Sequence, residues 1–384
     1  MPGRLGEKLT KGDVMTNFDG FKTISVVGVG LIGGSFGLAL KNKGYDAKII
    51  GIDRPGNLEA AFQRGAIDEG FTREQFKEGV TDADLILLCA PIHIILRQLE
   101  ELGDYIKPGA VITDAGSIKR HIVETATIYL PTHCDFIGGH PMAGSEYKGV
   151  SAADDFLFEN ATWVLTPNRP VAQPKVKALV EMLELIGAKV LIMQSRLHDE
   201  IAAAVSHLPQ MAALALMNLV ADKNEESPYF LKMAAGGFRD MTRIASSPYG
   251  IWESICDTNS DMIRAFIDYY IEELKRVRDV LSDEKELERY FGKAARNRLS
   301  IPTDTKGFLN PQFEISVTAV DRPGVIASIA TILAENQINI KDMEVLKIRE
   351  NEGGTFRLAF ASEEDQVNAI ELLRAEGFDC RKRG

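Results

Sequence analysis

The sequence has few cysteines, and none of them forms a recognisable cluster. Cys89, Cys134, Cys256 and Cys380 are far apart, and no CxxC pair occurs. This spacing argues against a disulfide framework and against a zinc site. We therefore expect reduced thiols, a cytoplasmic location and no bound metal.

Positive charge is also scarce, because 44 Lys and Arg residues face 55 Asp and Glu residues, a net charge of −11. A field of this sign repels phosphate backbones and anionic membrane surfaces. We expect neither nucleic acid nor membrane as a partner. An anionic substrate must therefore meet a local group of positive side chains.

The N-terminus lacks the apolar segment of a secretory signal, so we expect residues 1–20 to form a flexible tail. One stretch, residues 201–221, has no charged side chain and is long enough to raise the question of a membrane span. It is rich in alanine and contains His207, Pro209 and Gln210, which favours a helix buried in protein.

At 384 residues the chain is too long for one ordinary core. In residues 21–193, short apolar runs alternate with amphipathic helical stretches, which predicts a Rossmann-type doubly wound α/β sheet. The expected strands are residues 24–27, 48–52, 85–89, 111–113, 161–166 and 188–193; the expected helices are residues 31–43, 57–64, 118–130 and 175–186.

The remaining chain changes character twice. Residues 194–297 have helical periodicity only, including a long helix expected over 251–281, and their alanine content predicts a homodimer formed by an all-helical domain. Residues 298–311 contain prolines and a glycine and are expected to be a linker. Residues 312–384 follow the order strand, helix, strand, strand, helix, strand, which is the ferredoxin-like βαββαβ pattern.

A glycine-rich string follows the first predicted strand and opens a helix, as a dinucleotide-binding loop requires. Its candidate cofactor residues are Gly28, Gly30, Leu31, Ile32 and Gly33. Asp53 follows the next strand, about 20 residues further on, where a carboxylate binds the ribose hydroxyls and repels a 2′-phosphate. This favours NAD over NADP, although the neighbouring Arg54 leaves NADP open.

Two polar residues follow predicted strands at the sheet edge where ligands bind in this fold. His140 lies in a Gly-Gly-His-Pro turn and is the candidate acid/base residue; the alternative is a structural histidine. Ser117 follows the strand at residues 111–113, where its hydroxyl is a candidate partner for the histidine or the substrate. Serine also favours the N-cap of the next helix.

The helical region carries candidate substrate residues. Arg239 and Arg243 in the string GGFRDMTR suit a carboxylate clamp, and the alternative is a pair of solvated surface arginines. His207 and Trp252 are candidate pocket walls or core residues. Pro209 should kink the helix and turn His207 inward.

The strings GVGLIGGS, DAGSIK, GGHPMAGSE, SHLPQ and GGFRDMTRIASS, in this order, resemble the prephenate dehydrogenase family of tyrosine biosynthesis. The resemblance covers residues 21 to about 297 and implies that NAD oxidises prephenate to 4-hydroxyphenylpyruvate, CO₂ and NADH. It implies that His140 removes the proton of the ring hydroxyl, that Ser117 orients this histidine, and that Arg243 binds a substrate carboxylate. The resemblance further implies that the substrate pocket is lined by His207, Gly236 and Arg239 and that Trp252 reaches it from a partner subunit. It also implies that Glu146 and Asp240 pair with the arginines.

The segment that begins at Phe313 resembles an ACT domain, a module that binds amino acids. The resemblance implies that Gly324 and Asn339 contact an effector, for which tyrosine is the obvious candidate; the alternative is a purely structural dimerisation module. Two other functions stay open. One is an arogenate or dual-specificity cyclohexadienyl dehydrogenase, and the other is a non-catalytic NAD or amino-acid sensor.

Overall fold

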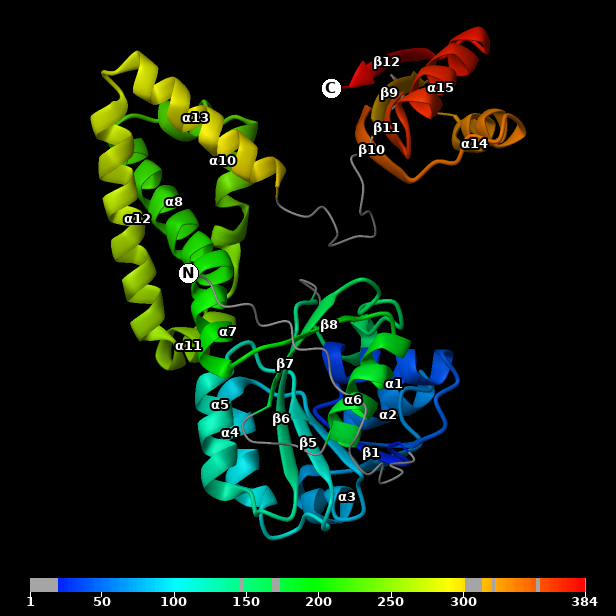
Figure 1. Ribbon diagram of the computed structural model, residues 1–384, viewed down its shortest axis with the longest axis vertical. Helices are drawn as coiled ribbons and strands as arrows, with labels where there is room; N and C mark the ends of the chain where they lie inside the picture. The colour runs from blue at the N-terminus through cyan, green and yellow to red at the C-terminus, as the bar shows by residue number, and fades with distance from the viewer. Residues whose placement is uncertain are drawn as a thin grey trace. The chain divides into compact units, whose positions relative to one another are not determined.

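The computed structural model describes residues 20–144, 148–167, 173–300, 313–319, 322–349 and 353–383. The chain divides into two compact units, residues 1–295 and 296–384. The first unit combines an α/β part with a helical part, and the second is a small α/β domain (Figure 1).

The first unit is built on one eight-stranded sheet with the strand order β3-β2-β1-β4-β5-β6-β7-β8. Strands β1 to β6 are parallel, β7 is antiparallel to β6, and β8 is parallel to β7. Most of these strands are short and rich in apolar residues, as is usual where helices cover both faces of a sheet. Their bounds are β1 (Thr23–Val27), β2 (Lys48–Ile52), β3 (Glu69–Phe71), β4 (Leu85–Leu88), β5 (Val111–Asp114), β6 (Asp135–Pro141), β7 (Thr162–Pro167) and β8 (Lys189–Ile192).

Helices cover both faces of this sheet, so the predicted doubly wound fold is confirmed (Figure 1). One face carries α1 (Leu31–Asn42), α2 (Pro55–Gln63) and α6 (Gln173–Leu185), and its core includes Phe36 and Trp163. The other face carries α3 (Phe76–Val80), α4 (Ile92–Leu102) and α5 (Arg120–Tyr129), and its core includes Ile95 and Ile122. The strands and helices expected from the sequence did not include β3, α3 or α4.

The helical part begins with α7 (Ser195–Ala202), a π-helical turn (Ala203–His207) and α8 (Leu208–Glu226). The prediction of a single helix over residues 251–281 is wrong, because the helix is interrupted at Asn259. The Asn259 side chain is buried and donates a hydrogen bond to the Asp199 carbonyl, a contact that overrides helical continuity. The other elements are α9 (Tyr229–Lys232), α10 (Gly236–Thr242), the 3-10 turn η4 (Arg243–Ser246), α11 (Tyr249–Thr258), α12 (Ser260–Val280) and α13 (Glu284–Leu299).

The continuous helix formed by residues 195–226 is long and apolar enough to cross a membrane, by length and composition only. Only 22% of its apolar 18-residue segment is buried. The expectation that this helix is buried inside the protein is therefore wrong for a single chain. Val205 and Leu219 are exposed on it because no other part of the described chain covers them. Exposed apolar surface of this kind often marks an interaction site.

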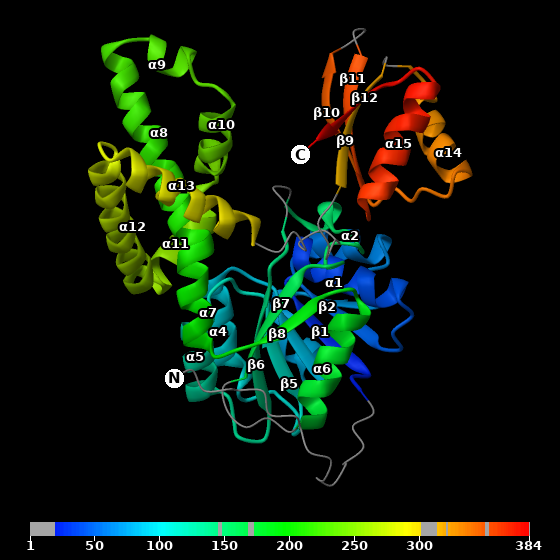
Figure 2. The same cartoon turned by 45° about the horizontal axis from the view of Figure 1, so that its top comes forward.

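The second unit has a four-stranded antiparallel sheet in the order β10-β11-β9-β12. Two helices pack on one face of the sheet, around a core that includes Ile315, Ile329 and Leu373 (Figure 2). The predicted βαββαβ pattern is confirmed. The bounds are β9 (Phe313–Ala319), α14 (Val325–Glu335), β10 (Asp342–Arg349), β11 (Gly353–Phe360), α15 (Glu363–Ala375) and β12 (Asp379–Arg383).

The predicted linker at residues 298–311 begins inside α13, and most of it lies outside the described residues. The domain boundaries proposed from the sequence stay predictions.

Candidate active site

The glycine loop between β1 and α1 has the shape that a dinucleotide pyrophosphate needs. Gly28 has a φ of +97°, and a Cβ there would lie 2.4 Å from the Cys89 carbonyl oxygen; a Cβ at Gly33 would lie 2.2 Å from the Gly28 carbonyl oxygen. A Cβ at Gly30 would have no neighbour within 4 Å. The N-terminus of α1 is therefore open to a phosphate group, and the loop fits the cofactor.

The predicted ribose-binding carboxylate lies next to this loop. Asp53 is buried at the end of β2 and accepts hydrogen bonds from the backbone N–H groups of Val29, at 2.9 Å, and Arg54, at 2.7 Å. The carboxylate thus holds the glycine loop in place. Arg54 is exposed at the start of α2.

A pocket of about 200 Å³ lies at the ends of β1 and β2 and extends to α4. Its apolar walls include Ile52, Phe76 and Ile94, and Arg73 and Arg97 add positive charge. A pocket with apolar and charged walls beside the glycine loop suits the adenine end of a dinucleotide.

A buried ion pair lies under the other end of the site. Lys119 Nζ donates to the Asp114 carboxylate and, at 2.5 Å, to the Gly139 carbonyl oxygen. Asp114 also accepts the N–H groups of Gly116, at 2.8 Å, and Gly139, at 3.0 Å. Burial lowers the pKa of Lys119, and the Asp114 carboxylate opposes this shift. The pair fastens the end of β6 to the end of β5.

The two glycines that precede His140 let β6 lie close to its neighbouring strands. A Cβ at Gly138 would lie 2.3 Å from Thr166 Oγ1, and a Cβ at Gly139 would lie 2.3 Å from the Asp114 carbonyl oxygen. Glycine is the residue that fits at both positions. This is the physical meaning of the Gly-Gly-His string, and it places His140 at the carboxyl edge of the sheet.

His140 is the first member of a hydrogen-bonded chain. Its Nδ1 lies 2.8 Å from Nε2 of His198, and Nδ1 of His198 lies 2.7 Å from Oδ1 of Asp199. His198 and Asp199 are both buried on α7. Sequence reasoning missed them because nothing in the local pattern links α7 to a histidine 58 residues earlier.

The Asp199 carboxylate also accepts the backbone N–H groups of Lys119, at 2.7 Å, and Arg120, at 2.8 Å. It thus satisfies the first turn of α5, which begins at Arg120 and not at Ile118 as predicted. The predicted N-cap role of Ser117 is therefore wrong, because a side chain from α7 supplies the acceptors.

The electrostatic surroundings keep His140 neutral. Burial, the largest cause, lowers the pKa of His140 well below 6.5. At neutral pH the imidazole therefore has a free nitrogen lone pair and can accept a proton.

His207 ends the π-helical turn and points inward, as expected from Pro209 two residues later. Burial lowers its pKa to about 4. Its ring meets Trp252 edge to face, with 5.9 Å between ring centroids, and its Nδ1 lies 3.4 Å from Nδ2 of Asn259. Trp252 packs on His207 of its own chain, and its expected role in the pocket of a partner subunit stays a prediction.

The other predicted site residues are more scattered. Ser117 is half-buried, and among the described residues no hydrogen bond joins it to His140, whose Nδ1 faces His198. Arg243 lies in η4, which leads into the helix of Trp252. The helix α10 lies beside α8 (Figures 1 and 2). Among its exposed residues are Gly236, Arg239 and Asp240.

Three predicted residues belong to other parts of the chain. Glu146 lies outside the described residues. In the second unit, Gly324 precedes α14 with a φ of +90°, a left-handed conformation that favours glycine. Asn339 is exposed between α14 and β10.

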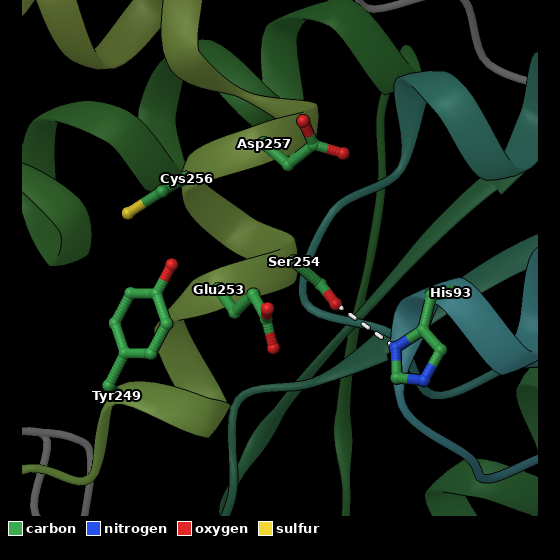
Figure 3. Close-up of a pocket in the computed structure, with 6 residues that line it drawn as sticks. All are labelled: His93, Tyr249, Glu253, Ser254, Cys256 and Asp257. Carbon is green, nitrogen blue, oxygen red and sulfur yellow. Dashed lines mark hydrogen bonds between the residues drawn. The ribbon is translucent and has the colours of Figure 1, made fainter.

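A larger pocket of about 640 Å³ lies between α4 and α11 (Figure 3). His93 Nδ1 and Ser254 Oγ, 3.3 Å apart, point toward one another across it. Glu253 and Asp257 also line it and would repel a carboxylate substrate. None of the predicted site residues lines this pocket.

Three families match the chain in succession. Residues 36–192 match the family described as "Prephenate dehydrogenase, nucleotide-binding domain", and residues 194–293 match "Prephenate dehydrogenase, dimerization domain". Residues 313–378 match "ACT domain". The predicted order of a Rossmann-type, a helical and an ACT domain is confirmed.

Individual proteins agree with these matches. The chain is 37% identical over 357 residues to the prephenate dehydrogenase of Bacillus subtilis, which covers 92% of this chain and 96% of the relative. A solved prephenate dehydrogenase from A. aeolicus, in complex with hydroxyphenyl propionate and NAD⁺, is 31% identical with a TM-score of 0.67 and covers 73% of this chain and 98% of its own. The Synechocystis arogenate dehydrogenase structure is 31% identical with a TM-score of 0.65, at coverages of 72% and 98%.

The buried ion pair leads to a stability prediction. Lys119→Met should lower the free energy of unfolding by roughly 3–5 kcal/mol, because it leaves the Asp114 carboxylate buried without its cation. Urea unfolding followed by circular dichroism measures this change. The matched control is Lys22→Met, which breaks the exposed pair with Asp46 and should cost less than about 1 kcal/mol. Equal losses in the two variants would contradict the role of the pair.

Proposed function

Since the chain belongs to the prephenate dehydrogenase family, we propose that it oxidises prephenate with NAD to 4-hydroxyphenylpyruvate, CO₂ and NADH in tyrosine biosynthesis. The observation that carries this proposal is the position of His140 at the carboxyl edge of the sheet that also bears the glycine loop. Ligands bind at this edge in doubly wound folds.

The reaction asks little of the protein beyond alignment and one proton transfer. Bound at the glycine loop of residues 28–33, NAD would supply the acceptor for the hydride of the substrate ring. His140 takes the proton of the ring hydroxyl and returns one to the phenolate oxygen after CO₂ has left. Loss of CO₂ and formation of an aromatic ring drive the reaction, so one neutral histidine suffices as the base.

The substrate carboxylates need positive partners in this acidic protein. Arg243 is the proposed clamp, because a guanidinium binds a carboxylate with two parallel hydrogen bonds. His207 and Trp252 are proposed walls of the pocket, and their edge-to-face contact supports this role. Proposed secondary contacts are Ser117, Gly236, Arg239, Asp240 and Glu146.

The helical region is a dimerisation domain by its family match, and we propose that it joins two copies of this chain. Large apolar side chains are exposed on a single chain, among them Met233 at 80% and Val205 at 62%. A second copy would cover them. The proposed location of this assembly is the cytoplasm.

The ACT domain suggests an amino-acid effector, and we propose tyrosine, the product of the pathway, as a feedback regulator. The left-handed turn at Gly324 exposes the N-terminus of α14, and Asn339 adds an exposed amide in a nearby loop. An amino-acid carboxylate suits such a helix terminus.

Arogenate is the second candidate substrate, alone or beside prephenate. The solved arogenate dehydrogenase is as similar to this chain as the solved prephenate dehydrogenase, at 31% identity. A non-catalytic sensor is disfavoured, because the chain has His140, Ser117 and Arg243 together.

The first test is turnover with prephenate and arogenate, each with NAD and NADP. We expect prephenate with NAD to be the best pair, and higher turnover with arogenate would favour the second candidate.

His140→Asn should lower kcat by roughly 100-fold or more, the scale of a lost general base, with little change in KM. The matched control is His121→Gln, an exposed position on α5, which should leave turnover unchanged. Near-normal turnover of a folded His140→Asn variant would contradict the assignment.

The proposed clamp makes a different kinetic prediction. Arg243→Ala should raise KM for prephenate by roughly tenfold or more, because a charge-assisted hydrogen bond contributes about 1.5–3 kcal/mol. Steady-state kinetics measures this, with Arg276→Ala on the exposed side of α12 as control. An unchanged KM would remove Arg243 from the carboxylate site.

The regulatory proposal is tested by calorimetry of the whole enzyme with tyrosine. We expect saturable binding that Asn339→Ala weakens and that Glu335→Ala, at the exposed end of α14, leaves intact. Absence of binding at millimolar tyrosine would count against tyrosine as the effector.

A further inference from the structure

The chain of hydrogen bonds from His140 through His198 to Asp199 determines which imidazole nitrogens carry protons, as well as where the side chains lie. A neutral imidazole has one protonated and one unprotonated nitrogen, and its hydrogen bonds decide which is which. Each histidine contacts the next residue of the chain through its Nδ1: His140 contacts His198, and His198 contacts Asp199. The protonation of His140 therefore depends on the far end of this chain.

Asp199 defines that far end. Its carboxylate accepts the backbone N–H groups of Lys119 and Arg120 in addition to its contact with His198. Hydrogen bonds donated to a carboxylate stabilise the charged form, which can only accept. Nδ1 of His198 must therefore carry the proton in its bond with Asp199.

The consequence passes along the chain. In the neutral form of His198, a proton on Nδ1 leaves a lone pair on Nε2, and this lone pair accepts a hydrogen bond from Nδ1–H of His140. His140 then has its own lone pair on Nε2. This nitrogen is the one that His198 leaves free for the substrate.

We propose that His198 and Asp199 are positioning residues that hold His140 in the tautomer with an unprotonated Nε2, the form that accepts the proton of the substrate hydroxyl. This inference rests on the proposed function for its catalytic meaning. It assigns to α7 the orienting role that the family resemblance assigned to Ser117. As His140 gains a proton, the same chain stabilises the positive charge through the Asp199 carboxylate.

Nuclear magnetic resonance of the unliganded wild-type enzyme tests the tautomer without any assay of activity. With ¹⁵N-labelled histidine, we expect the shifts of a protonated Nδ1 and an unprotonated Nε2 for His140, whose signals are assigned by their loss in His140→Asn. A protonated Nε2 in the wild-type protein would overturn the proposal.

Two substitutions of His198 separate its two contacts. The amide of asparagine occupies the place of Nδ1, so His198→Asn keeps the bond to Asp199 and loses the bond to His140. The longer His198→Gln reaches His140 with an amide oxygen that can accept from Nδ1–H. We expect His198→Asn to lower kcat on the order of 10- to 100-fold with little change in KM, and His198→Gln to recover part of this loss; a fully wrong tautomer costs about 10⁴-fold in a serine protease.

The outcomes distinguish this inference from the proposed function. If His140→Asn abolishes turnover while His198→Asn keeps wild-type kcat and tautomer, the function stands and the inference falls. If the wild-type enzyme does not oxidise prephenate, the function falls while the ¹⁵N spectrum still decides the tautomer. Urea unfolding of both variants identifies losses of activity that come from unfolding, and the wild-type spectrum remains decisive if a variant does not fold.

Discussion

The buried ion pair of Lys119 and Asp114 is the interaction on which the rest of the active site depends. A charge without a partner in the interior costs several kcal/mol, so these two groups must stay together and keep their remaining hydrogen bonds. Those bonds go to both backbone groups of Gly139, the residue before His140. The end of β6 is thus held by a constraint that cannot relax without leaving a charge unpaired.

The same short segment after β5 also joins the sheet to the helical part of the chain. Asp199 on α7 accepts the first N–H groups of α5, and Arg120 on α5 makes two hydrogen bonds of 2.8 Å with Asp261 on α12. Asn259 continues this network toward His207. The residues that cap helices therefore also position His140, the proposed base, and we expect a disturbance of either role to affect the other.

Much of the fold follows from local patterns. Apolar runs such as residues 48–52 and 111–113 predict buried strands, and the glycines at 28, 30 and 33 predict the phosphate loop from its position between a strand and a helix. The break at Asn259 was missed, because helical periodicity continues through it and only a hydrogen bond to another helix ends the first segment. The short strand β3 was missed because three residues are too few for a pattern.

The sequence by itself determined the order of the three domains, the cofactor loop and the position of His140 at a strand end, because these depend on residues close together in the chain. Only the tertiary structure decided what surrounds His140. The bond to His198 spans 58 residues, and the bond from Lys119 to Asp199 spans 80. No local preference encodes such contacts, since burial removes water and obliges each polar group to find whichever partner the packed helices bring near.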